Sequence, residues 1–245
     1  MTFTPFAKAK RWMAILGAIF AMGTVTSADA GLFGLGGTSW KEEVLLHDGS
    51  TIVVDRSQSY GGRHEIGQTP PIKEQEISFS VPGTGERVIW KSEYGEDIGR
   101  ANFLALALHI SKGNAYIVAE PHLCLSYNKW GRPNPTYVIF KYQGKEWKQV
   151  SLQELPSEFK NINLVISTKA EMKEISAQSI VSANLIRELN STLKRPEYRT
   201  ILREPVKSGE GSLINCEKLV FYKGAWVGPG DSIGKRMRDL ETRQP

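Results

Sequence analysis

The chain has 245 residues, of which 40% are hydrophobic and 23% are charged, and its formal net charge is +5. A chain of this length can bury one sizeable core. Its basic residues are scattered among acidic ones, which excludes the basic stripe of a nucleic-acid-binding protein, so no nucleic-acid partner is expected.

The first thirty residues have the three parts of a cleaved secretory signal. The basic start contains Lys8, Lys10 and Arg11. A mostly apolar run follows at residues 12–25, and Ala28-Asp29-Ala30 forms the A-x-A cleavage site. The apolar run is shorter than the roughly 20 residues that a membrane-spanning helix needs. We therefore expect residues 1–30 to be removed and the protein to be periplasmic or secreted, and not transmembrane after cleavage. An uncleaved anchor is the alternative.

The mature chain is expected to begin with a flexible lead, residues 31–39, which has four glycines and no charge. Residues 40–245 then form one β-rich domain. Cys124 and Cys216 are the only cysteines, and in an oxidising compartment they are expected to form one disulfide. Two buried free thiols are the alternative.

Four hairpin patterns follow in chain order. β-prone runs meet at turn sequences that are, in order, Asp48-Gly49, residues 82–85, residues 112–114 and residues 143–145. Short strands joined by such turns predict a mainly antiparallel β protein. The strands are too few for a closed propeller, so we expect a meander that is either sandwich-like or partial-propeller-like.

One long amphipathic helix is predicted over about 168–194. Thr168 and Glu171 match a capping box, and apolar residues recur at helical spacing until Lys194-Arg195-Pro196. We interpret the apolar stripe as core packing against a sheet.

No catalytic motif is complete. Residues 230–234 read G-x-S-x-G, but no histidine follows Ser232, whereas the α/β-hydrolase order places the histidine after the serine. The four histidines lack metal-ligand spacing, so no metal and no cofactor are predicted. The acids that could supply a hydrolase pair are Glu93, Glu96, Asp97 and Glu120.

The stretch "YNKWGRPNP", residues 127–135, supplies the candidate binding residues. They are Tyr127, Trp130, Arg132 and Asn134. Aromatic rings and an arginine on a proline-stiffened loop suit contact with a glycan, a peptide or a protein. In the alternative interpretation, Trp130 covers a sheet edge and the prolines prevent strand pairing.

The same region carries a resemblance. The sequences "KWGRPNPTYVIFKY" and "LQELPSEF" resemble uncharacterised exported proteins of proteobacteria, over about residues 40–165. This resemblance implies export and no particular activity.

The function expected from the sequence is a non-catalytic periplasmic or secreted module that binds a protein or glycan of the cell envelope. The sequence is more consistent with a binding protein than with an enzyme, and it does not indicate whether the protein binds a small molecule. The alternatives are an envelope-polymer hydrolase that uses loop carboxylates, and a structural accessory subunit.

Overall fold

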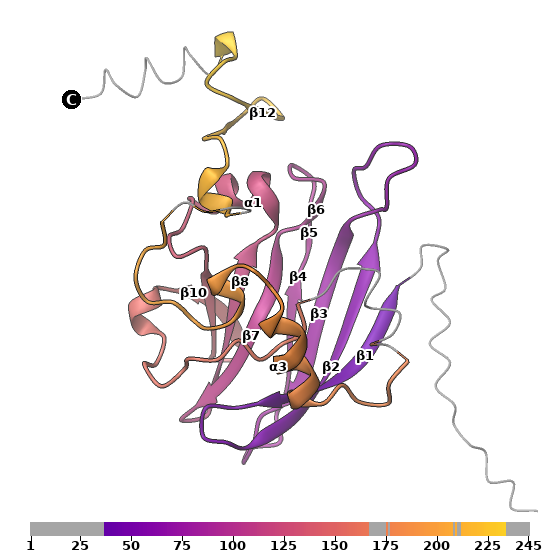
Figure 1. Cartoon of the computed structure of the whole chain (residues 1–245), viewed down its shortest axis with the longest axis vertical. Helices are drawn as coiled ribbons and strands as arrows, with labels where there is room; N and C mark the ends of the chain where they lie inside the picture. Colours follow the sequence, from indigo (N-terminus) through magenta and orange to yellow (C-terminus); the bar gives the residue numbers. More distant parts are fainter. Residues whose placement is uncertain (1–36, 167–174, 176, 208, 210–211, 234–245) are drawn as a thin grey trace, which may run out of the picture. The chain divides into compact units, whose positions relative to one another are not determined.

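The computed structural model describes residues 37–166, 175, 177–207, 209 and 212–233. The predicted signal, residues 1–30, lies outside this part of the chain. The described residues form a mainly antiparallel β structure, as the turn sequences predicted (Figure 1). The first strand already begins at Thr38, within the predicted lead.

The first sheet is a four-stranded antiparallel meander in chain order. Its strands are β1 (Thr38–Leu45), β2 (Thr51–Tyr60), β3 (Ile72–Ser80) and β4 (Arg87–Ser92). The first hairpin forms at the predicted Asp48-Gly49 turn, where the Asp48 carboxylate accepts the Ser50 N–H at 3.0 Å. Gly49 has φ +85° there, a conformation that glycine adopts without steric cost.

The second sheet is also a four-stranded antiparallel meander, and its order along the sheet is β10-β9-β8-β7. Its strands are β7 (Phe103–Ser111), β8 (Asn114–Pro121), β9 (Val138–Gln143) and β10 (Glu146–Val150). Two further short pieces, β5 (Tyr94–Gly95) and β6 (Arg100–Ala101), pair with each other between the sheets in sequence. The predicted turns at 112–114 and 143–145 are both present.

The two sheets pack face to face as a sandwich. Alternation along each strand sends every second side chain inward, and the apolar inward residues of both sheets form one core. Its largest members include Ile77, Phe79, Trp90, Phe103, Leu108 and Ile117. Of the two arrangements that the sequence allowed, the structure shows the sandwich.

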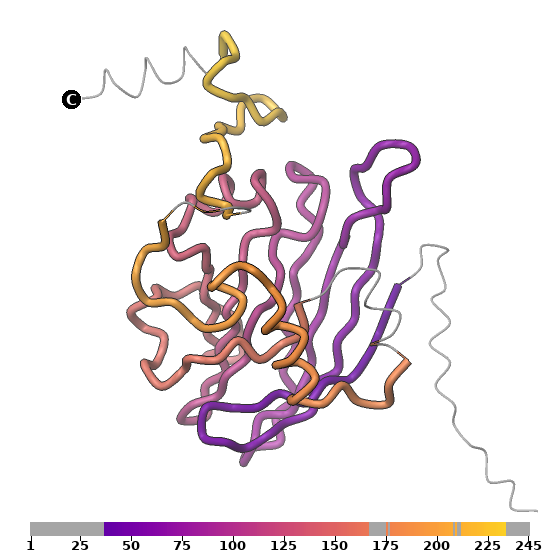
Figure 2. Tube along the Cα trace, in the orientation of Figure 1, coloured from indigo at the N-terminus to yellow at the C-terminus, as the bar shows by residue number. Residues whose placement is uncertain are grey.

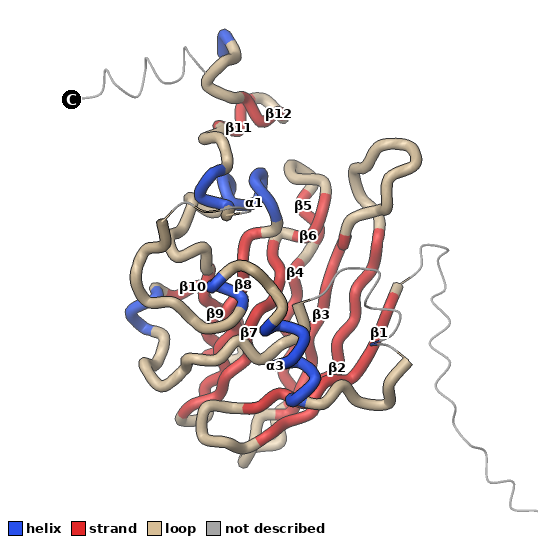
Figure 3. The backbone as a smooth tube through the Cα atoms, viewed as in Figure 1, coloured by secondary structure: helices blue, strands red, loops and turns tan. Residues whose placement is uncertain are grey.

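The outer faces of the two sheets differ. The second sheet is covered on its outer face by loops within residues 150–166 and 196–203, which bury Leu106, Val118 and Phe159 (Figure 3). The first sheet turns a polar outer face to solvent, with exposed side chains such as Ser57 and Lys91. Three sheet faces are therefore buried and one is open.

The described helix near the predicted one is shorter than expected. Helix α3 (Ala183–Ser191) begins after Ser182, whose hydroxyl accepts the Leu185 N–H at 3.3 Å, and its apolar side packs against β1 as predicted. Residues 177–182 are not helical, because the Val181 backbone pairs instead with Lys41 and Glu43 of β1, both at 2.9 Å.

The predicted capping box, Thr168 and Glu171, lies outside the described residues. Within the described part of the chain, no helix combines the length and the apolar character needed to cross a bilayer.

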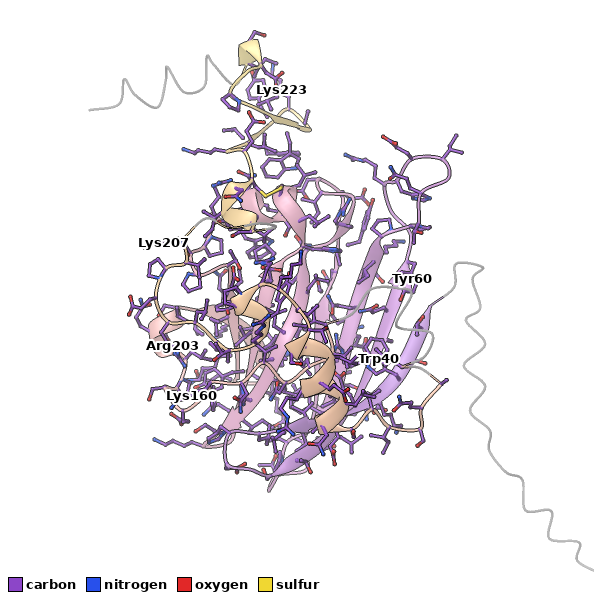
Figure 4. The ribbon with its side chains drawn as sticks, viewed as in Figure 1. Trp40, Tyr60, Lys160, Arg203, Lys207 and Lys223 are labelled. Atoms are coloured by element: carbon purple, nitrogen blue, oxygen red, sulfur yellow. A yellow bond between two sulfur atoms is a disulfide. The ribbon has the colours of Figure 1, made fainter. Side chains whose placement is uncertain are left out.

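The C-terminal part of the chain is attached by a disulfide. Helix α1 (Leu123–Lys129) carries Cys124, and Cys216 follows the short helix η3 (Leu213–Asn215). Their sulfur atoms are 2.05 Å apart, so the predicted pairing is confirmed (Figure 4). A two-stranded hairpin, β11 (Val220–Tyr222) and β12 (Ala225–Val227), follows the bridge (Figure 2).

Candidate functional site

The loop between α1 and β9 binds the chain's own C-terminal segment. Arg132 donates from its guanidinium to three backbone carbonyls, those of Ile214 at 3.3 Å, Cys216 at 2.7 Å and Glu217 at 3.1 Å. We call this arrangement, in which residues 124–134 hold Val206 and residues 212–219, the clasp. The disulfide from Cys124 lies within it.

Two asparagines extend the clasp. Asn134 donates to the Val206 carbonyl at 3.1 Å and accepts the Val206 N–H at 2.8 Å. Asn128 also donates one hydrogen bond and accepts another: its amide donates to the Glu217 carbonyl at 3.0 Å and accepts the Leu219 N–H at 2.8 Å. An asparagine amide supplies one donor and one acceptor side by side, as a neighbouring strand would. The sequence prediction included Asn134 but missed Asn128.

Two aromatic residues, Tyr127 of α1 and Trp130 at its C-terminal end, pack against the neighbouring parts of the fold. Tyr127 is 2% exposed, its ring lies 4.9 Å from the Arg132 guanidinium, and burial raises the pKa of its hydroxyl. Trp130 is partly buried against Phe103, with ring centroids 4.5 Å apart. Its indole N–H donates to Asn102 at 3.3 Å.

The structure therefore brings Tyr127 of α1 and Arg132 together, and it places Trp130 and Asn134 at separate points of the segment between α1 and β9. All the contacts described above lie within the chain. Recognition of an external partner by these four residues stays a prediction.

A hollow of about 490 Å³ lies beside the clasp and includes Asn134 in its lining. Two polar side chains of its lining are already engaged. Asn134 pairs with Val206, and Arg203 donates to the carbonyls of Leu155 at 2.8 Å and Pro156 at 2.6 Å. This hollow offers a ligand few unoccupied charged groups.

Glu120, one of the predicted hydrolase acids, lies at the end of β8 and is 2% exposed. Its carboxylate accepts from Thr136 at 2.9 Å, Tyr198 at 2.5 Å and Arg195 at 3.2 Å. Burial raises the pKa of Glu120, and Arg195 and these hydrogen bonds oppose that rise. Both carboxylate oxygens are engaged, so Glu120 links β8 to residues 195–198, and it is not part of the groove lining that contains Glu93 and Glu96.

The open face of the first sheet carries a groove of about 550 Å³. It is lined by residues of β2, β3 and β4 and of the segment that follows β4, namely Ser57, Ser59, Lys73, Glu74, Gln75, Glu76, Lys91, Ser92, Glu93, Tyr94 and Glu96. The predicted acids Glu93 and Glu96 thus meet here, together with two acids of β3. Asp97 is used elsewhere, in an ion pair with Lys129 at 2.7 Å.

Carboxylates outnumber amines in the groove by four to two. Lys91 lies 2.9 Å from Glu76. The hydrogen bond to Glu76 raises the pKa of Lys91, and the negative charges of nearby glutamates raise it further. The Lys73 ammonium lies 5.5 Å from the Tyr94 ring centroid. Both amines have local partners, so the lining presents a ligand mainly with carboxylate and hydroxyl oxygens, which accept hydrogen bonds.

The end of the groove is fixed by a close backbone contact. Loop 61–71 meets the turn between β5 and β6, where the Arg63 N–H donates to Gly99 O at 2.9 Å. A Cβ on Gly62, which has φ +87°, would lie 2.4 Å from that same oxygen. Only glycine fits this position, and the contact holds the turn that carries Glu96.

Two of the described histidines, His109 and His122, are buried in the fold. His109 stacks on Phe159 with ring centroids 4.6 Å apart, and its Nε2 lies 2.9 Å from the Asn161 carbonyl. Burial lowers the pKa of His109 and of His122 to about 4. Among the residues that the structure describes, no group of three or more His, Cys, Asp or Glu side chains is placed to hold a metal ion.

Comparison of the chain with models of protein families, with curated proteins and with solved structures finds no match. The groove and the clasp are therefore interpreted from their own geometry and chemistry.

Proposed function

We propose that this protein is an exported, non-catalytic binding module whose open sheet face binds a glycan component of the cell envelope. The observation that carries the proposal is the groove of about 550 Å³ on the one polar sheet face. Binding sites are concave and place a few polar groups on a rigid framework. Here the framework is the three strands β2, β3 and β4.

The chemistry of the lining supports a glycan as the ligand. A glycan presents many hydroxyl donors, and the groove presents the hydroxyl of Ser57 and the carboxylates of Glu93 and Glu96 as acceptors. Tyr94 adds an aromatic ring of the kind that contacts the apolar face of a sugar. Hydrogen bonds to ionised acceptors are stronger than those between neutral groups.

Two observations support export. Residues 1–30 have the pattern of a secretory signal, and the Cys124–Cys216 disulfide is of a kind that persists in oxidising compartments. The resemblance of residues 40–165 to exported proteobacterial proteins agrees with this assignment. We therefore propose a periplasmic or secreted location.

The test is calorimetric titration of the purified chain with soluble fragments of envelope glycan. Replacing Glu93→Gln and Glu96→Gln together should weaken binding by roughly tenfold or more, because each lost charge-assisted hydrogen bond is worth about 1.5–3 kcal/mol. Asp55→Asn is the matched control, since Asp55 pairs with Lys41 at 3.1 Å on β1 and β2 and lies outside the groove lining.

Several results would reject the proposal. They are an unchanged affinity in the double variant, an equal loss in Asp55→Asn, and the absence of binding to every glycan fragment. Binding of extended peptides in place of glycans would keep the groove as a site and change the ligand class.

A hydrolase acting on the same polymer is the second candidate, because Glu93 and Glu96 lie in one groove and glycoside hydrolysis uses a pair of carboxyl groups. Release of shortened products from the titrated glycan, abolished by Glu93→Gln or by Glu96→Gln alone, would establish it. A structural accessory subunit would instead co-purify with one protein at fixed stoichiometry and bind no glycan.

A further inference from the structure

A second, smaller pocket lies where α3 packs beside β1 (Figure 1). Its volume is about 180 Å³, below the range of roughly 300–1,000 Å³ that is typical of sites for larger ligands. The lining comes from the end of β1, from residues 161–163, from the first residues of α3 and from Arg199. It shares no residue with the groove on the open sheet face, so the pocket is a separate site.

Half of the lining is apolar. Its apolar members are Leu45, Ile162, Ala183 and Ile186. Ile162 and Ile186 are buried, at 6% and 2% exposure. The buried polar member, Asn163, is already engaged, because its amide donates to the Leu45 carbonyl at 2.9 Å and its oxygen accepts the Leu108 N–H at 2.9 Å. The buried part of the pocket therefore offers a ligand mainly aliphatic contacts.

The exposed part of the lining carries two guanidinium groups, those of Arg187 and Arg199. Each is held by one hydrogen bond at 2.8 Å, from Arg187 to the side-chain oxygen of Asn184 and from Arg199 Nε to the Leu193 carbonyl. A guanidinium has five N–H donors. Among the residues that the structure describes, no further hydrogen bond or ion pair engages these two groups, so most of their donors are open to a ligand.

No carboxylate belongs to the lining of this pocket among the described residues. Glu43 contacts the same end of α3, but its carboxylate accepts the Ala183 N–H at 3.2 Å and is not part of the lining. Glu188 follows Arg187 in the chain and is also outside the lining. The pocket thus has the opposite charge to the groove, where carboxylates outnumber amines. It is complementary to an anion.

The aliphatic wall narrows the class of anion. A planar guanidinium pairs with a carboxylate through two parallel hydrogen bonds. An inorganic anion would leave Ile162 and Ile186 without a contact, whereas an aliphatic acid removes apolar surface from water on both sides. The small volume limits the aliphatic body to a few carbon atoms.

We propose that this pocket binds the carboxylate of a small aliphatic acid, with Arg187 and Arg199 contacting the carboxylate and Ile162 and Ile186 contacting the aliphatic body. The same chemical group occurs in a free short-chain acid and in the C-terminal leucine of a peptide. This binding is independent of the ligand in the groove.

The test is an NMR titration of the isotope-labelled chain with 4-methylpentanoate and, separately, with the tripeptide alanyl-alanyl-leucine. We expect the backbone amide signals of Ala183 and Ile186 to shift as 4-methylpentanoate binds. Tighter binding of the tripeptide would identify a peptide C-terminus as the source of the carboxylate, and tighter binding of 4-methylpentanoate would identify a free acid.

Two further compounds separate the contributions of charge and of the aliphatic body. The neutral 4-methylpentanamide should bind more weakly than 4-methylpentanoate by roughly tenfold or more, because the charge-assisted hydrogen bonds are lost. Inorganic phosphate should also bind more weakly, because it has no aliphatic body. Equal binding of the amide, or equal binding of phosphate, would overturn the proposal.

Substitutions locate the site. Arg187→Gln and Arg199→Gln should each weaken binding of 4-methylpentanoate by roughly tenfold or more. Arg87→Gln is the matched control, because Arg87 is also exposed and also makes a 2.8 Å hydrogen bond, to the Ser78 hydroxyl, but lies on β4 outside the lining. Ala183→Leu keeps both arginines of the pocket and fills it, so this variant should lose binding.

A thermal melt of every variant establishes that it is folded. Absence of binding by the parent chain, an equal loss in Arg87→Gln, or full binding by a folded Ala183→Leu variant would overturn the proposal. The groove variant with Glu93→Gln and Glu96→Gln should bind 4-methylpentanoate normally, so the two proposals fail separately.

Discussion

The guanidinium of Arg132 donates a 2.7 Å hydrogen bond to the backbone carbonyl of Cys216, the same residue whose sulfur is bonded to Cys124. The covalent and the non-covalent attachments of the C-terminal segment therefore meet at one residue. The loop that carries Arg132 was predicted to contact a glycan, a peptide or a protein, and the segment found there belongs to the protein itself.

Removing the disulfide should destabilise the protein strongly. The bridge joins residues 92 apart in sequence, and by the chain-entropy argument a loop of that size contributes about 4–5 kcal/mol. Replacing both cysteines with serine should lower the free energy of unfolding by about that amount in chemical denaturation. An unfolding midpoint equal to that of the parent chain would contradict this role.

Arg132→Ala should loosen the clasp while leaving the disulfide in place. Three carbonyls lose a charged donor, so we expect a loss of about 2 kcal/mol in stability and faster proteolytic cleavage within residues 206–219. Arg132→Lys is the informative control, because an ammonium cannot span three carbonyls in the way a planar guanidinium does. If Arg132→Lys resisted proteolysis as well as the parent chain does, the positive charge alone, without the guanidinium geometry, would account for the stability of the clasp.

Trp130→Ala should cost about 3 kcal/mol of stability, as expected for deletion of a packed aromatic ring. Trp130→Phe should keep the contact with Phe103 and lose only the hydrogen bond to Asn102, at about 1 kcal/mol. Thermal melts of the two variants measure the difference. A stable Trp130→Ala variant that binds an envelope partner more weakly would instead support the loop as an external contact surface.

Glu120→Gln should be strongly destabilising, because it leaves the partly buried Arg195 without this counter-charge; breaking such a pair costs about 3–5 kcal/mol. The control is Asp97→Asn in the more exposed pair with Lys129, which should cost less than about 1 kcal/mol. Denaturant titration of both variants compares the two pairs. An equal loss of stability in Glu120→Gln and Asp97→Asn would show that burial does not make one ion pair more important for stability than the other.

Stability should fall in mild acid. Burial lowers the pKa of His109 from 6.5 to about 4, so between these values the unfolded chain binds a proton that the folded chain does not. The stabilisation is complete above pH 6.5 and is lost as the pH falls to about 4, by up to about 3 kcal/mol. His109→Gln, measured by denaturation across this range, should show a shallower decline, with His122 still contributing its own share. An unchanged pH profile would contradict this assignment.

The parts of the fold that depend on neighbouring residues could be predicted from the sequence. Asp48-Gly49 specifies its hairpin through local backbone geometry, and the stripe that contains Ile186 specifies an amphipathic helix. The prediction that the helix runs through residues 177–182 was wrong because Val181 pairs with β1, a contact between distant segments that no local pattern reveals.

The site was predicted in part for the same reason. Glu93 and Glu96 were selected as acids on a loop, but the groove also requires Glu74 and Glu76 from β3, which only the strand register brings beside them. The roles of Asn134 and Arg132 depend on residues 206–219, and Asn128 gave no signal beyond the paired donor and acceptor of its side chain.

The order of the strands allows both sheets to fold before the C-terminal segment is made. In both sheets each strand lies beside the one made just before it, so the sandwich can assemble while later residues are still emerging, through contacts of low sequence separation. Helix α3 and loop 196–203 must be made before they can cover the sheets, and the clasp waits for residues that come later still. We expect a chain truncated before Val206 to form both sheets yet keep a lone thiol at Cys124, so bridge formation reports that synthesis has passed Cys216.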